Sequence, residues 1–284
     1  MTTTALLNGL TFGALLMVLA SGLAMMYGLR GVMNFAHGAL YMFGAYFGYS
    51  IAGATNFWVA LAVVPIVMAV AGLLIERFAL RHLIGREILE VALATFGVAL
   101  VLEHLIIDRW GRRDLGLRAP AGLDGVTSVF GRPYPTYRLF VLIVGYTSMA
   151  ALIVWLRRSQ IGLHVRAASH DRETTSMMGV DIDRVSAVVV AMSVALAGLA
   201  GVMAGPYLSL SPGMGTDILI PSLIVVVIGG LGSIPGAMVA ALGLGLLQTF
   251  GASLPSTVAQ FLPYLALIVV LAVRPQGLGG RRVA

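Results

Sequence analysis

The chain has 284 residues, of which 59% are hydrophobic and only 11% are charged, and its formal net charge is +6. Soluble globular domains usually carry about a quarter charged residues, so this composition, with a mean hydropathy of +0.95, excludes a soluble domain and indicates a membrane protein. Cysteine and lysine are both absent, which excludes disulfides, thiolate metal sites and the lysine of a nucleotide-binding P-loop. Any nucleotide that drives the protein must therefore bind another chain. We expect no metal, no cofactor and no nucleic acid partner.

Apolar runs long enough to cross a membrane as helices recur along the whole sequence. A helix needs roughly 17 to 25 apolar residues to cross a hydrocarbon core of about 30 Å. Nine such runs are predicted, over residues 4–29, 36–54, 57–75, 88–107, 139–156, 185–204, 218–232, 237–250 and 257–273. The seventh and eighth are short and interrupted by proline and glycine, so either could be a broken or re-entrant helix. The expected fold is an all-α, polytopic bundle of eight or nine transmembrane or partly broken helices, forming a single domain over residues 1–284.

Segment 157–184 holds nine charged residues in a chain that is otherwise apolar. Residues 165–178 contain neither glycine nor proline and are followed by Gly179, a residue typical of the position after a helix C-terminus, so a short polar helix is predicted. Two interpretations stay open from the residues alone. The helix is either a solvated loop helix, which any polytopic protein could have, or a docking element for a cytoplasmic partner.

The distribution of arginines predicts the orientation in the membrane. With segment 157–184 in the cytoplasm, twelve of the 18 arginines lie inside and six outside, so the positive-inside rule favours an external N-terminus and a cytoplasmic C-terminus. Nine crossings require the same arrangement. The loop 108–138 opposes it, because it carries six arginines and is placed outside, although long loops count less in the rule than short ones.

Small residues four positions apart recur along the predicted spans, as in Gly9 and Gly13, Gly44 and Gly48, Gly201 and Gly205, and Gly232 and Gly236. This spacing lets helix backbones approach closely in lipid, where no hydrophobic effect drives helices together. Helix packing is therefore the expected role of Gly201, Gly205, Gly232 and Gly236. Some of these glycines could instead line a path where substrate meets the backbone.

Polar candidates for a transport path are few. Asn34 precedes the second span and could cap it, with His37 in its first turn, and a helix N-terminus near the membrane interior can also receive a carboxylate. Glu90 and Glu103 lie near opposite ends of the fourth span, roughly 20 Å apart, so each could reach an interface, and a proton relay has no further support. No pair of residues has the spacing of a hydrolase or metal site, so no catalytic residue is predicted.

Three stretches together resemble one family, and the resemblance covers nearly the whole chain. They are residues 28–38 (GLRGVMNFAHG), residues 158–168 with 179–184 (RSQIGLHVRAA and GVDIDR), and residues 229–237 (GGLGSIPGA). They are similar to the inner-membrane permease subunits of branched-chain amino-acid ABC transporters. The resemblance implies that 157–184 is a cytoplasmic coupling segment, in which Arg166, Ala168, Asp171 and Gly179 contact an ATP-binding subunit. It also implies a paralogous permease as heterodimer partner, one or two ATP-binding subunits, a periplasmic substrate-binding protein and a bacterial inner membrane.

Two departures from the family pattern bear on the cargo. Pro221 and Ser222 stand where well-known members carry a lysine, and Gly279 stands where a bulkier apolar residue is usual. Ser222 joins Asn34 and His37 as a substrate-path candidate. Members resembling this family are assigned to urea, amides and aromatic acids as well as to leucine, isoleucine and valine. The expected function is therefore the permease subunit of an ATP-driven importer for such a solute, not itself an enzyme, and the alternative is a proton-coupled secondary transporter.

Overall fold

The computed structural model describes residues 2–83 and 85–280, and most of them are helical. In chain order the elements are α1 (Thr2–Arg30), α2 (His37–Ala54), α3 (Phe57–Phe78), the 3-10 helix η1 (Leu80–Leu83), α4 (Ile88–Trp110), β1 (Val126–Val129), β2 (Arg132–Pro135), α5 (Thr136–Arg158), α6 (Gln160–His170), α7 (Arg172–Met177), α8 (Ile182–Ala204), α9 (Met214–Gly229), α10 (Ile234–Gly251), α11 (Ser256–Ala259) and α12 (Leu262–Val273). The two strands form one antiparallel hairpin, in which Val126 pairs with Pro135. The all-α, polytopic expectation is confirmed.

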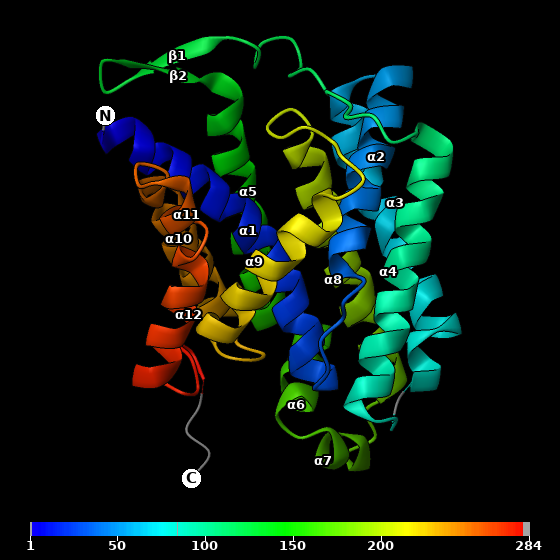
Figure 1. Cartoon of the computed structure of the whole chain (residues 1–284). Coiled ribbons are helices and arrows are strands. Elements are labelled where there is room, and N and C mark those ends of the chain that lie inside the picture. The colour runs from blue at the N-terminus through cyan, green and yellow to red at the C-terminus, as the bar shows by residue number, and fades with distance from the viewer. Residues whose placement is uncertain (1, 84, 281–284) are drawn as a thin grey trace.

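The bundle has two ends, which we call the hairpin end and the α7 end after the elements that lie there (Figure 1). α1 starts at the hairpin end and runs toward the α7 end, and the long helices that follow alternate in direction. Among the described residues, α1, α3, α4, α5, α8 and α10 are long and apolar enough to cross a membrane. α9 and α12 are apolar but shorter. The first described residues and the tail after α12 consequently lie at opposite ends of the bundle (Figure 1).

α1 and α8 form the centre of the bundle, and most of their side chains are buried. Their close contacts depend on glycine. A Cβ atom at Gly44 of α2 would lie 2.6 Å from the Cα of Gly198 in α8, and one at Gly245 of α10 would lie 2.6 Å from the Cα of Gly13 in α1. Both distances are too short for any other residue, so glycine lets these backbones pack directly on one another.

α2 and α9 both begin part-way along the bundle rather than at one of its ends (Figure 1). The chain leaves α1 at Arg30, turns at Gly31 with φ of +69°, and returns beside α1 and α4 before α2 starts. Two hydrogen bonds hold the returning segment against α1 and α4. Phe35 N donates to the Thr95 hydroxyl at 3.2 Å, and the His37 ring contacts the Leu19 carbonyl through Nε2 at 3.0 Å. The second expected span, over 36–54, therefore starts inside the bundle.

Three other expected elements differ from the helices observed. The span 218–232 is a helix only to Gly229, because Gly230 and Gly232 adopt φ values of +95° and +81° that end it. The span 257–273 consists of α11 and α12, and Pro263 occupies the first turn of α12, where a missing N–H is tolerated. The single polar helix expected over 165–178 is two helices, α6 and α7, separated at Asp171.

The outward faces of α3 and α4 are apolar and exposed. Ile66 of α3 is 66% exposed, and Leu93 and Val101 of α4 are 63% and 61% exposed. Contiguous apolar surface of this kind on a helical bundle faces lipid or another membrane subunit rather than water. The structure is therefore that of a multi-pass membrane protein.

Candidate functional site

The predicted coupling segment, residues 157–184, lies at the α7 end (Figure 1) and is anchored on the bundle by one face of α6. Val165 and Ala168 are each 3% exposed and belong to the hydrophobic core, whereas Arg166 is exposed. Gly162 makes the tight return from α5 possible, because a Cβ atom there would lie 2.7 Å from the Cα of Leu156. Among the residues predicted to contact an ATP-binding subunit, Ala168 therefore faces the bundle, and its contact with that subunit stays a prediction. Arg166 faces outward.

Asp171 fixes the junction between α6 and α7. Its carboxylate accepts the N–H of Thr174 at 2.9 Å and the Thr174 hydroxyl at 2.5 Å, which makes it the N-cap of α7. The hydrogen bonds from Thr174, first the hydroxyl and then the N–H, lower the pKa of the Asp171 carboxyl below its ordinary value. Gly179 follows α7 with φ of +85°, and a side chain there would meet open space, so it is the backbone conformation that calls for glycine. The segment thus presents a rigid, exposed carboxylate.

A groove of about 590 Å³ runs along α6. Its polar lining includes Arg157, Arg166 and His170, and its other wall is formed by residues 231–235 and the tail after α12. The tail is held in place because Gly279 N donates to the Gly229 carbonyl at 2.9 Å, which satisfies the end of α9. A Cβ atom at Gly279 would lie 3.1 Å from this carbonyl oxygen, so the small residue suits this packing.

A buried ionic network lies next to the coupling segment. Arg30, at the end of α1, forms an ion pair with Glu76 of α3, and their side chains are only 10% and 5% exposed. Ser186 of α8 joins both, because it accepts a hydrogen bond from Arg30 at 2.9 Å and donates one to Glu76 at 2.8 Å. Arg30 also donates to the carbonyl of Leu80 at 3.1 Å. One guanidinium therefore ties α1 to α3, η1 and α8.

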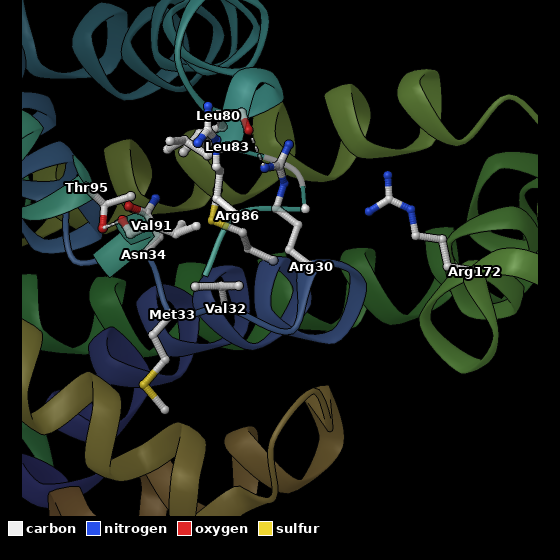
Figure 2. Close-up of a pocket in the computed structure, with 12 residues that line it drawn as sticks. Arg30, Val32, Met33, Asn34, Leu80, Leu83, Arg86, Val91, Thr95 and Arg172 are labelled. Atoms are coloured by element: carbon white, nitrogen blue, oxygen red, sulfur yellow. Dashed lines mark hydrogen bonds between the residues drawn. The ribbon is translucent and has the colours of Figure 1, made fainter. Parts of the chain in front are cut away.

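This network borders a cavity of about 110 Å³ between the bundle and α7 (Figure 2). Arg172 approaches it from α7, Arg86 from the turn before α4, and Asn34 from the returning chain (Figure 2). Arg86 is exposed and its pair with Glu90, at 3.9 Å, lies at the start of α4. The cavity is thus the place where the coupling segment meets the first helices of the bundle.

The three substrate-path candidates do not converge on one cavity among the described residues. Asn34 borders the arginine-rich cavity, and its side chain accepts the N–H of Ala36 at 3.0 Å, so it caps a turn before α2 rather than α2 itself. His37 is fully buried and its Nδ1 has no partner in the described structure. Ser222 is buried and donates to the carbonyl of Ile218 in its own helix at 2.7 Å.

The predicted packing glycines have different surroundings. Gly201 lies within α8 against α2, where a Cβ atom would be 2.7 Å from the N of Ala45. Gly236 lies in the first turn of α10 against the backbone of Gly229. Gly205 and Gly232 lie outside the helices: Gly205 follows α8 beside Leu117, and Gly232 is in the loop before α10. Close backbone approach at these two sites involves loops.

Comparison with known protein families identifies the family to which this chain belongs. The model of the family "Branched-chain amino acid transport system / permease component" matches residues 5–271. The chain belongs to this family. The permease is 33% identical, over 96% of its own length and 94% of the relative's, to the high-affinity branched-chain amino acid transport system permease protein LivH of Escherichia coli K12. It is 31% identical to the corresponding protein BraD of Pseudomonas aeruginosa, with 97% and 95% of the two chains covered.

Solved structures extend the comparison to the fold. The permease superposes on PsaBC from Streptococcus pneumoniae, solved in complex with Fab, with a TM-score of 0.52 at 14% sequence identity. The match covers 94% of the permease and 89% of the other chain. At this identity the likeness is one of helical architecture alone.

Proposed function

We propose that this permease is one membrane subunit of an ATP-driven importer for branched-chain amino acids or a related small solute, such as urea, an amide or an aromatic acid. The observation that carries the proposal is the family match over residues 5–271. The absence of lysine supports the division of labour, because a P-loop lysine must then come from an ATP-binding partner. A second, paralogous permease and a periplasmic substrate-binding protein complete the proposed assembly, with one or two ATP-binding subunits.

The decisive experiment is uptake of labelled leucine into vesicles that contain the whole assembly. We expect uptake to require ATP and to continue in the presence of a protonophore. Uptake without ATP that collapses with the protonophore would instead favour the proton-coupled secondary transporter, and would draw attention to Glu90 and Glu103.

We propose that the α7 end faces the cytoplasm of the bacterial inner membrane and the hairpin end faces the periplasm. The arginine distribution supports this orientation. The hairpin would then be available to the substrate-binding protein, and Phe130 at its tip is 85% exposed. Because the chain has no native cysteine, a cysteine at Phe130 can be labelled selectively. Labelling only from the cytoplasmic side would contradict this orientation.

The groove along α6 is proposed to receive the ATP-binding subunit, with Arg166 and Asp171 as contacts. Both side chains are exposed at the α7 end, and Asp171 is held rigidly by its cap. Gly179 sets the turn that leads from α7 into α8, and Ala168 anchors α6. Movement of α6 and α7 would reach α1 and α3 through the cavity where Arg172 approaches the Arg30 network (Figure 2).

Charge reversal at the groove should uncouple the assembly. Arg166→Glu is expected to lower substrate-stimulated ATP hydrolysis by about tenfold. An exposed arginine contacts acidic groups on its partner, and a glutamate at this position would repel them. Arg158→Glu is the matched control, because Arg158 is exposed nearby but does not line the groove. Equal hydrolysis rates in both variants and the unmodified complex would contradict a coupling role for Arg166.

The substrate path is proposed to pass the inner ends of α2 and α9. Both helices begin part-way along the bundle, and neither has a side-chain cap at its N-terminus. The N-terminal turns of such broken helices can bind a substrate carboxylate. His37, in the first turn of α2, is the strongest of the three substrate-path residues because its buried Nδ1 is unpartnered within the described structure. His37→Ala should lower uptake while leaving basal ATP hydrolysis unchanged, and unaltered uptake would remove it from the path.

A further inference from the structure

Asp217 is an acidic side chain at the inner end of α9, the helix that begins part-way along the bundle (Figure 1). It is in the first turn of α9, two residues after Gly215, whose backbone packs against Gly38. Gly38 follows His37, which contacts Leu19 of α1. From Leu19 to the end of α1 at residue 30 is roughly 16 Å along the helix. If a hydrocarbon core of about 30 Å ends near Arg30, this contact layer lies about half-way across it.

The Asp217 carboxylate makes no ion pair with another residue of 2–83 or 85–280, and its side chain is exposed on the bundle surface. Ionisable residues at this depth are costly unless they face a polar cavity or a partner of opposite charge. Lipid cannot supply that charge at the middle of the membrane. Asp217 therefore requires either a hydrated polar groove or a cation that comes from outside this chain.

Asp217 opens into a groove of about 1010 Å³ between α9, the end of α10 and the α11–α12 region. The polar side chains that line it with Asp217 are Thr216, Gln248, Gln260 and Tyr264, and the apolar ones include Ile220, Ile224 and Phe261. Ile220 is 43% exposed and Phe261 is 59% exposed, so the apolar wall is accessible. One carboxylate, two amides and an aliphatic wall are thus arranged along a single surface.

We propose that this groove binds the zwitterion of an aliphatic amino acid during transport. Asp217 accepts hydrogen bonds from the substrate's ammonium group, the amide NH₂ groups of Gln248 and Gln260 donate to its carboxylate, and Ile220 contacts its side chain. This inference rests on the proposed transport function and adds the group that recognises the ammonium. A solute that lacks an ammonium group cannot donate a charge-assisted hydrogen bond to the Asp217 carboxylate.

Protection of an introduced cysteine tests the assignment in the assembled complex. Ile220→Cys places a thiol in the groove of a chain that has no other cysteine. Leucine is expected to slow its alkylation by N-ethylmaleimide, whereas 4-methylpentanoate, which lacks the ammonium group, should not. Adding Asp217→Asn should reduce the protection by leucine about tenfold or more, as expected for loss of a charge-assisted hydrogen bond. Asp217→Glu should retain most of it.

Val239→Cys is the matched control, because Val239 is 61% exposed on α10 outside the groove and should be alkylated equally with and without leucine. Equal protection by leucine and 4-methylpentanoate, protection by neither, or protection that survives Asp217→Asn would overturn the proposal. So would loss of the second permease from the purified Asp217→Asn complex, because Asp217 would then pair with that subunit. ATP-dependent uptake by the unmodified complex, measured in parallel, separates failure at this groove from failure of the transport function.

Discussion

Glu76→Ala is expected to lower the free energy of unfolding of the permease by about 3 to 5 kcal/mol, because it would leave Arg30 buried without its counterion. The pair is almost completely buried, and Ser186 hydrogen-bonds to both partners, so water cannot readily replace the lost carboxylate. The expected result is a marked loss of monodisperse complex after heating in detergent, measured by size-exclusion chromatography.

Glu90→Ala provides the control for this experiment. Glu90 lies 3.9 Å from Arg86, and both side chains are more than half exposed, so its loss should cost less than about 1 kcal/mol. The double variant Arg30→Met with Glu76→Met should recover part of the stability that Glu76→Ala loses, because it removes both buried charges together. Equal thermal stability of the Glu76→Ala and Glu90→Ala complexes would contradict the importance of the buried pair.

Gly201→Leu is expected to prevent α2 from packing on α8. A Cβ atom at Gly201 would lie 2.7 Å from the backbone N of Ala45, so the added side chain can fit only if the two helices separate. Overpacking costs about 1 to 3 kcal/mol where neighbouring side chains can move, and backbone atoms of two helices have less freedom. We expect little folded permease in the membrane fraction, measured by the yield of detergent-soluble, monodisperse protein.

The matched substitution is Gly97→Leu in α4. Gly97 is also within a long apolar helix, but a Cβ atom there would meet nothing within 4 Å. Its replacement should leave the yield unchanged or raise it slightly, since leucine favours helix more than glycine does. A similar loss of yield in both variants would mean that helix packing at Gly201 is not the cause.

Three charged residues of the helices could not be predicted from the sequence because of where the apolar runs stop. The predicted spans end at residue 29, end at residue 75 and begin at residue 218, whereas the helices continue to Arg30, include Glu76 and already contain Asp217. Each of these charged residues lies one position outside a predicted span. A hydropathy pattern treats a charge as the end of a span, so it cannot reveal that the charge is neutralised by a partner from another helix.

Segment 157–184 was the part of the candidate site whose structure the residues predicted best. A run of charges between two apolar spans predicted an exposed polar helix, and Gly179 predicted where it ends. The break at Asp171 was missed, although aspartate is a common N-cap, because an N-cap is recognised by the hydrogen bond that it makes to a backbone N–H three residues later. The groove beside Arg166 also could not be foreseen, since its other wall comes from residues more than 60 positions away.

By itself, the sequence determined that this chain is a membrane protein, approximately where its helices lie, and which family it resembles. Hydrophobicity and motif spacing are local properties of the chain, so they can be read from the order of residues. Only the tertiary structure decided that α2 and α9 begin inside the bundle, that Arg30 pairs with Glu76, and that Asp217 opens into a groove. These features depend on contacts between helices distant in the sequence. In lipid such contacts are selected by close packing and by the pairing of buried polar groups, and neither is visible in the order of apolar residues.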